Sequence, residues 1–84
     1  MQKIFLVFTL LALTEMAMAS PICDAPRSNW IKEVDFQKEL KRQGYLIKTF
    51  KIINGCYEIY GLDPLGKRVQ IYFDPTTGTS VKSE

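Results

Sequence analysis

Residues 44–78 read GYLIKTFKIINGCYEIYGLDPLGKRVQIYFDPTTG, and this stretch decides the fold. Aromatic and β-branched residues dominate it, as is typical of strands. Asn54-Gly55 is a strong hairpin signal, because both residues tolerate positive φ. Residues 63–66 and 74–78 each place a proline in a turn. We therefore predict a three-stranded antiparallel meander, to which residues 80–82 could add a short edge piece, with strands over 45–53, 56–62 and 67–73.

Alternation along these strands separates their side chains into two faces. The face expected under a helix carries Tyr57 and Ile59 from the second strand and Val69, Ile71 and Phe73 from the third. The first strand is less regular, because its two inward candidates, Ile47 and Phe50, have opposite parity. A β-bulge near Lys48-Thr49 would reconcile them. Alternatively, both faces of that strand are partly buried.

A helix is predicted over residues 30–43, which contain neither glycine nor proline. Ser28 and Asn29 are good N-cap residues, and Gly44 stands where a left-handed residue ends a helix. Four-residue spacing suits one apolar stripe made by Trp30, Val34, Phe36 and Leu40. Trp30 is expected in a core or staple role rather than as a partner hot spot. The predicted class is α+β, with one helix packed on the meander.

The first 19 residues are predicted to be a cleavable signal peptide. Lys3 gives a positive start, residues 4–13 are apolar except for Thr9, and Ala17-Met18-Ala19 fits a cleavage site. An apolar run of about ten residues is too short for a membrane anchor, because hydrocarbon is roughly 30 Å thick. Residues 20–84 are then a single domain, periplasmic or secreted, with no membrane span after cleavage.

Two cysteines, Cys23 and Cys56, lie in that domain. In an oxidising compartment they predict one structural disulfide. On the chain-entropy model, closing this loop stabilises the fold by roughly 4 kcal/mol. A redox-active pair is disfavoured because the chain has no Cys-x-x-Cys motif. A zinc site is disfavoured because two cysteines alone cannot complete its ligand set.

The composition argues against most catalytic chemistry. The chain has no histidine, which excludes Ser-His-Asp and Cys-His catalysis, and it has no glycine-rich phosphate loop. Its net charge is only +2, and the basic residues are spread along the chain, so nucleic acid is not the expected partner. We predict a non-enzyme without metal or other cofactor.

One surface is predicted to bind a partner. The strand residues that point away from the helix form a face that we expect to be uncovered, and they are Glu58, Tyr60, Arg68, Gln70 and Tyr72. Tyrosine and arginine are enriched at binding surfaces. The alternative is an ordinary solvated sheet face, on which cross-strand tyrosines are common. The binding hypothesis predicts that replacing both tyrosines by alanine leaves folding nearly intact and weakens partner capture.

Several motifs resemble the PepSY domain family, in its small exported stand-alone form. They are Cys23 followed by Trp30 at the helix start, Gly44-Tyr45, Gly55-Cys56-Tyr57-Glu58, and Tyr72-Phe73-Asp74-Pro75-Thr76-Thr77-Gly78. The resemblance implies a helix on an antiparallel meander. It also maps the family's strand-ending aspartate and its Thr-Gly turn onto Asp74, Thr77 and Gly78, which we expect to shape the turn rather than to act chemically.

The resemblance further implies a non-enzymatic binding module. The expected function is that of a trans-acting peptidase inhibitor or regulator in the cell envelope, with a peptidase or another envelope protein as its partner. The alternative is a structural or assembly interaction protein of the bacterial envelope. Proximity labelling would separate these two functions, because one predicts peptidases or sensors as neighbours and the other predicts assembly machinery.

Overall fold

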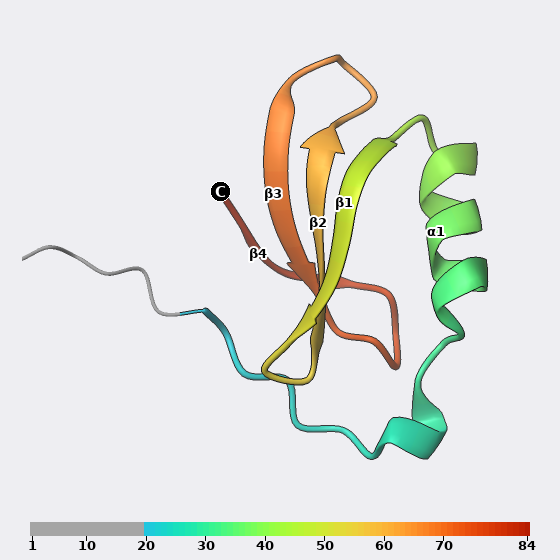
Figure 1. Ribbon diagram of the computed structural model, residues 1–84, viewed down its shortest axis with the longest axis vertical. Helices are drawn as coiled ribbons and strands as arrows, with labels where there is room; N and C mark the ends of the chain where they lie inside the picture. Colours follow the sequence, from blue (N-terminus) through green and yellow to red (C-terminus); the bar gives the residue numbers. More distant parts are fainter. Residues whose placement is uncertain (1–19) are drawn as a thin grey trace, which may run out of the picture.

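The computed structural model describes residues 20–84 and places one α-helix against a four-stranded antiparallel sheet. The predicted signal peptide lies outside the described residues. The elements are η1 (Arg27–Asn29), α1 (Glu33–Arg42), β1 (Leu46–Ile53), β2 (Cys56–Leu62), β3 (Arg68–Phe73) and β4 (Ser80–Ser83). Neighbouring strands in the sheet follow the order β1-β2-β3-β4, and α1 runs beside the sheet (Figure 1). The predicted α+β class, with a helix packed on a meander, is confirmed.

The three predicted strands are present, and the possible edge piece over residues 80–82 is a full fourth strand, β4, so the predicted count of three is one short. After β3 the turn closes through backbone hydrogen bonds, from the Asp74 N–H to the Thr79 carbonyl at 2.9 Å and from the Gly78 N–H to the Asp74 carbonyl at 2.8 Å. The chain then returns antiparallel, with Tyr72 opposite Lys82. Backbone pairing with β3 makes this edge strand, and the sequence SVKS, with little hydrophobic pattern, indicated it only as a possible short piece.

The β1–β2 hairpin has the predicted form. Asn54 and Gly55 both have positive φ, at 50° and 75°. The pairing register shifts between Ile47 and Thr49, which confirms the predicted bulge and leaves Lys48 outside the pairing. Opposite the bulge, a Cβ on Gly61 would lie 1.8 Å from the Leu46 carbonyl oxygen. Glycine at this position is what lets the two strands come this close.

Helix α1 begins three residues later than predicted. Ser28 and Asn29 belong to the short helix η1 and do not cap α1, whose N-cap is Lys32. The cause is Ile31, whose N–H donates to the Pro75 carbonyl at 2.7 Å and whose carbonyl accepts from the Tyr57 hydroxyl at 2.5 Å. These bonds hold the preceding chain extended against the sheet, so the helix can start only after them.

Of the four residues predicted to form one apolar stripe on the helix, two are buried in α1. Phe36 and Leu40 are buried, whereas Val34 is 63% exposed and points away from the sheet. Trp30 precedes α1, is partly buried against the core, and donates from Nε1 to the Ala25 carbonyl at 3.1 Å. Val34 lies two residues from Phe36, about 200° around the helix, so only the side that carries Phe36 and Leu40 contacts the sheet.

The core lies between α1 and one face of the sheet. It comprises Phe36, Leu40, Tyr57, Ile59, Ile71 and Phe73, with Val69, Ile47 and Phe50 partly buried beside it. The Phe36 ring lies 4.9 Å from the Tyr57 ring and 5.0 Å from the Phe73 ring, centroid to centroid. The inward residues predicted for the second and third strands therefore face the helix. Among residues 20–84, no helix is both long and apolar enough to cross a bilayer.

Candidate functional site

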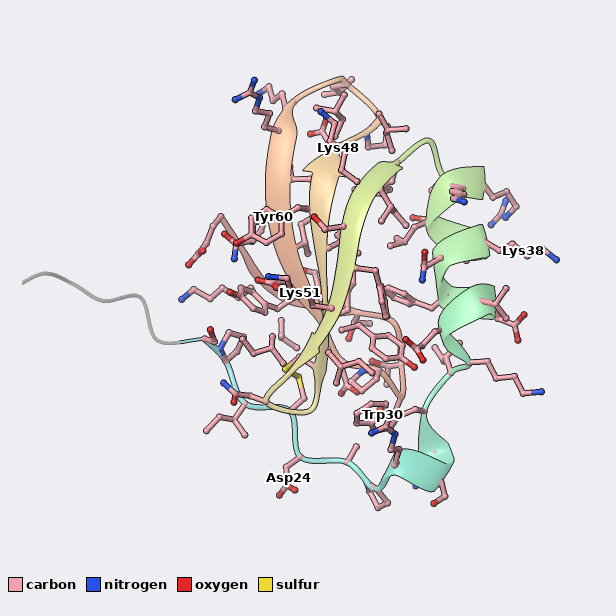
Figure 2. The ribbon with its side chains drawn as sticks, in the orientation of Figure 1. Asp24, Trp30, Lys38, Lys48, Lys51 and Tyr60 are labelled. Carbon is pink, nitrogen blue, oxygen red and sulfur yellow. A yellow bond between two sulfur atoms is a disulfide. The ribbon has the colours of Figure 1, made fainter. Side chains whose placement is uncertain are left out.

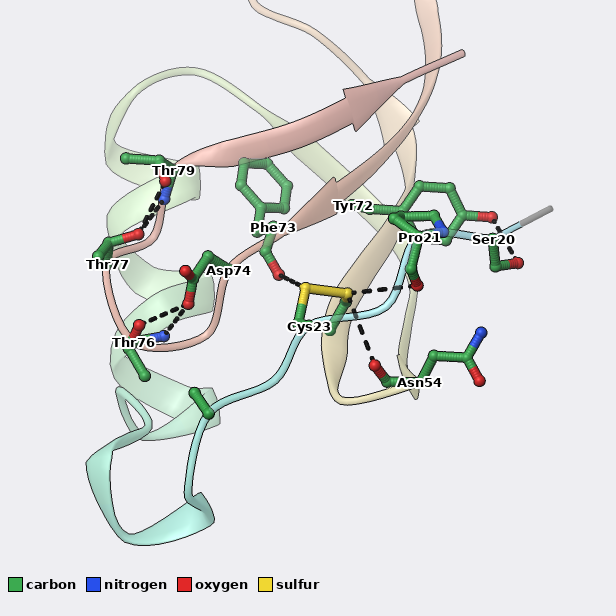
Figure 3. Close-up of a disulfide and its surroundings, with 12 residues drawn as sticks. Ser20, Pro21, Cys23, Asn54, Tyr72, Phe73, Asp74, Thr76, Thr77 and Thr79 are labelled. Carbon is green, nitrogen blue, oxygen red and sulfur yellow. Dashed lines mark hydrogen bonds between the residues drawn. A yellow bond between two sulfur atoms is a disulfide. The ribbon is translucent and has the colours of Figure 1, made fainter. Parts of the chain in front are cut away.

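The N-terminal strap, residues 20–23, crosses the sheet face that α1 does not cover. The Cys23 N–H donates to the Asn54 carbonyl at 2.9 Å, and Cys23 forms a disulfide with Cys56 (Figure 3). The strap presses closely on the hairpin, since a Cβ on Gly55 would lie 2.3 Å from the Cys23 carbonyl oxygen. The predicted disulfide is confirmed. It fixes the strap to the lower part of the sheet, where β2 begins.

Three of the predicted partner-binding residues form a polar network beside the strap. Gln70 Nε2 donates to Glu58 Oε2 at 2.7 Å and to the Tyr72 hydroxyl at 2.8 Å. The Tyr72 hydroxyl also lies 3.5 Å from Ser20 Oγ. No buried side-chain nitrogen or oxygen in the described part of the chain lacks a hydrogen-bond partner. The network is therefore satisfied internally.

The prediction of a fully uncovered face is wrong at this end of the sheet. Glu58 is only 3% exposed and Tyr72 only 4%. Two features enclose them: the strap, which the sequence did not place on this face, and β4, which the sequence indicated only as a possible edge piece. The strap approaches the Tyr72 hydroxyl through Ser20 (Figure 3), and β4 sets Lys82 beside Tyr72. Neither Glu58 nor Tyr72 offers much surface to a partner while the strap is in place.

The Tyr72 hydroxyl is held in its protonated form. Its hydrogen bond to Ser20 lowers the pKa, but burial and the carboxylates of Glu58 and Glu84 outweigh that effect and raise the pKa above its usual value. A tyrosine whose pKa is raised stays neutral at physiological pH. The network therefore has a structural role in holding the sheet face and the strap together, and Tyr72 is no candidate for a general base.

The other two predicted residues, Tyr60 and Arg68, are accessible. Tyr60 is 41% exposed, and Arg68 is exposed at the start of β3. Together with Lys48, Gly61 and Val69 they line a shallow hollow of about 220 Å³, which we call the sheet-face hollow. In Figure 2, Tyr60 and Lys51 lie on the sheet, well apart from Lys38 on the outer side of α1. Partner binding at this hollow stays a prediction.

Lys48, Gly61 and Val69 line the hollow but were not predicted as site residues, and Lys48 is the charged one among them. It occupies the bulge between Ile47 and Thr49, so simple alternation along the strand assigns it to no face. The bulge itself was predicted from the conflicting parity of Ile47 and Phe50. That bulge was the available signal, because a bulge commonly turns the side chain of its extra residue toward a new direction.

A second hollow of about 280 Å³ opens between α1 and the turn that follows β3. Phe36, Leu40 and Phe73 contribute apolar surface to it, and Asp35 and Glu39 contribute carboxylates. Glu39 pairs with Arg42 at 2.6 Å, and this hydrogen bond lowers the pKa of Glu39. A carboxyl group that stays ionised cannot act as a general acid near neutral pH. This hollow is the seam between helix and sheet.

The family comparison covers nearly the whole chain. The family model PepSY_2, described as peptidase propeptide and YPEB domain, matches residues 3–84. The chain belongs to the PepSY family. No curated protein and no solved structure matches the chain. The assignment agrees with the resemblance seen in the sequence motifs and with the helix-on-meander architecture.

In this PepSY domain the turn after β3 is organised by Asp74. Its Oδ1 accepts from the Thr76 N–H at 2.8 Å and from the Thr76 hydroxyl at 2.5 Å, and these bonds lower the pKa of Asp74. Thr77 Oγ1 lies 2.7 Å from Thr79 Oγ1, and Gly78 has a φ of 75°. The polar groups of these residues are used within the turn, which places Pro75 under the chain before α1. In residues 20–84, no three metal-ligating side chains cluster together.

Proposed function

We propose that this PepSY domain is an exported, non-catalytic binding module that acts in trans on a peptidase, as an inhibitor or regulator, in the periplasm or the medium. Membership of a family described as peptidase propeptide supports a module of this kind. The Cys23–Cys56 disulfide is consistent with an oxidising compartment. Sequence positions 1–19 supply the predicted export signal.

The observation that carries this proposal is the exposure of Tyr60 and Arg68 on one rigid sheet face. Tyrosine and arginine, with tryptophan, are enriched at the energetic centre of protein interfaces. Both lie on regular strands, paired as β2 and β3, so little order has to be gained on binding. The satisfied Glu58–Gln70–Tyr72 network beside them fixes the lower part of the same face.

An inhibition assay tests the proposal. The exported protein, with its disulfide intact, would be titrated into each secreted metallopeptidase of the source organism while cleavage of a fluorogenic peptide is followed. We expect a saturable decrease in rate with at least one peptidase. Tyr60→Ala should weaken the apparent inhibition by about tenfold or more, which corresponds to loss of a moderate hot spot.

The matched control is Val34→Ala. Val34 is 63% exposed on the outer side of α1, so its truncation removes apolar surface elsewhere on the molecule. The control should inhibit as the unchanged protein does. If the unchanged protein alters the rate of none of the secreted peptidases, the inhibitory role is wrong.

A further inference from the structure

Positive charge without a counter-ion gathers at the sheet-face hollow. Lys48 and Arg68 line it, and Lys51 is exposed farther along β1. No carboxylate of residues 20–84 lies within ion-pair distance of these three side chains. Glu58 stands directly opposite Lys51 in the sheet, but it is buried and accepts a hydrogen bond from Gln70. The carboxylate of Glu58 is thus already engaged within the protein.

Several other cationic side chains have partners. Arg42 pairs with Glu39 at 2.6 Å, Lys82 pairs with Glu84 at 3.2 Å, and the Arg27 guanidinium lies 5.0 Å from the centre of the Trp30 ring. Lys32, Lys38, Lys41 and Lys67 have no ion pair among residues 20–84 either. Lys48 and Arg68 differ from these lysines because they come from separate strands and flank an exposed aromatic ring. That arrangement leaves their hydrogen-bond donors available to a group from outside the chain.

The chemistry of the hollow suits a carboxylate. Arg68 offers a planar fork of N–H donors that matches the two oxygens of a carboxylate, and the ammonium of Lys48 adds a second positive charge. The Tyr60 ring, which lies on β2 between the strands that carry these cations, supplies apolar contact for an aliphatic stem. A glutamate side chain has both parts, a short aliphatic stem and a terminal carboxylate.

We propose that the sheet-face hollow recognises an acidic side chain on an extended acidic segment of the partner protein. Arg68 and Lys48 bind the carboxylate, and Tyr60 packs against its stem. Charge complementarity is the basis for this occupant, since the hollow presents cations that no described carboxylate neutralises. The inference rests on the proposed function, because it takes the partner to be a protein.

A peptide titration tests this inference. The probe is a fluorescein-labelled peptide of alternating glutamate and serine, compared with the same peptide carrying glutamine in place of glutamate. Fluorescence anisotropy would be measured with the disulfide-bonded protein at low salt. We expect the glutamate peptide to bind about tenfold more tightly or better. We also expect its binding to weaken strongly near 1 M salt, where the Debye length is only about 3 Å.

Charge reversal locates the site. Arg68→Glu and Lys48→Glu should each weaken binding of the glutamate peptide by about tenfold. The matched control is Lys38→Glu, which makes the same change of charge on the outer side of α1 (Figure 2) and should change binding less than about twofold. Backbone amide spectra of each variant would show that the fold is retained.

Three results would overturn the inference. They are equal binding of the glutamine peptide, an effect of Lys38→Glu as large as that of Arg68→Glu, and tighter binding of a single-stranded oligonucleotide or of anionic phospholipid vesicles than of the glutamate peptide. The peptidase assay separates this failure from failure of the proposed function. If Tyr60→Ala abolishes inhibition but Arg68→Glu does not change it, the inference is wrong and the proposed function stands.

Discussion

Gly61 is the residue at which the β1–β2 pair tolerates least change. A Cβ there would lie 1.8 Å from the Leu46 carbonyl oxygen, so Gly61→Ala must push the two strands apart beside the sheet-face hollow. We predict a loss of about 3 kcal/mol in the free energy of unfolding, measured by urea denaturation.

Gly66→Ala is the control for this substitution. Gly66 has a φ of 84° and no atom within 4 Å of the added Cβ, so it reports backbone strain alone, and we expect a loss of about 1 kcal/mol. Equal losses for the two variants would contradict the role of close strand approach at Gly61.

Tyr60 and Tyr72 share a sheet face but differ in what their removal should do. Tyr72 is 4% exposed beneath the strap, whereas Tyr60 is 41% exposed. Tyr72→Ala should cost about 3 kcal/mol or more, as for other buried aromatic side chains, and Tyr60→Ala less than about 1 kcal/mol. This replaces the sequence-based expectation that the double variant folds nearly normally. Urea denaturation midpoints of the two single variants test this difference in stability. Equal midpoints would show that the strap does not enclose Tyr72.

Asp74 links the turn after β3 to acid stability. Hydrogen bonds from the Thr76 hydroxyl and N–H lower the pKa of Asp74 below its ordinary value of 3.8. A carboxyl whose pKa is lower in the folded state adds stability above its unfolded pKa and loses it as the pH falls through the folded pKa. We predict that Asp74→Asn flattens the decline in urea midpoint on the acid side of pH 4. An unchanged acid profile would contradict this role.

Among the elements, the strand pattern could be predicted better than the segments that flank it. Turn chemistry at Asn54-Gly55 and the conflicting parity of Ile47 and Phe50 announced both the hairpin and the bulge. The start of α1 could not be found in the same way, because the long-range bonds of Ile31 to Pro75 and Tyr57 outweigh the local capping preference of Ser28 and Asn29. Strand β4 depends likewise on backbone pairing with β3.

The candidate site was predictable only in part for the same reason. Alternation correctly grouped Tyr60, Arg68 and Gln70 on one face, but it carries no information on what covers that face. Burial of Glu58 and Tyr72 depends on the strap. The strap is distant in sequence from the strand that it covers, since Cys23 and Phe73 are 50 residues apart along the chain. Only the disulfide linked these segments at the level of sequence, and two cysteines alone do not say which face the strap crosses.

A single covalent link, the disulfide, holds the strap to the sheet, so we can predict what reduction of that disulfide does. The Cys23–Cys56 disulfide spans a sequence separation of 33 residues, so its loss should cost about 4 kcal/mol on the chain-entropy model. We expect reductant to lower the melting temperature strongly and to speed hydrogen exchange at the Cys23 amide, which is bonded to Asn54. The Cys23→Ser/Cys56→Ser variant should have the melting temperature of the reduced protein, whether or not reductant is present. A melting temperature that is insensitive to reductant would contradict the role of the strap.

In the whole molecule, one face of the sheet packs against α1 to form the core, and the opposite face has a covered part and an open part. Its lower part is enclosed by the strap and the Glu58–Gln70–Tyr72 network, and its upper part is the sheet-face hollow. A domain of this size buries a limited core, so helix–sheet packing alone would make it only marginally stable. The disulfide and the strap add to that stability. The upper part can therefore remain open for a partner.

Site-specific photo-crosslinking tests whether that open part is where a partner binds. A benzophenone amino acid would replace Tyr60 in the protein expressed in the source organism, and a second variant would carry it in place of Lys38 on the outer side of α1. We predict that position 60 crosslinks to a peptidase or envelope protein identified by mass spectrometry, and that position 38 does not. Crosslinking of the same protein from position 38 with equal yield, or no crosslink from position 60, would contradict binding at the sheet face.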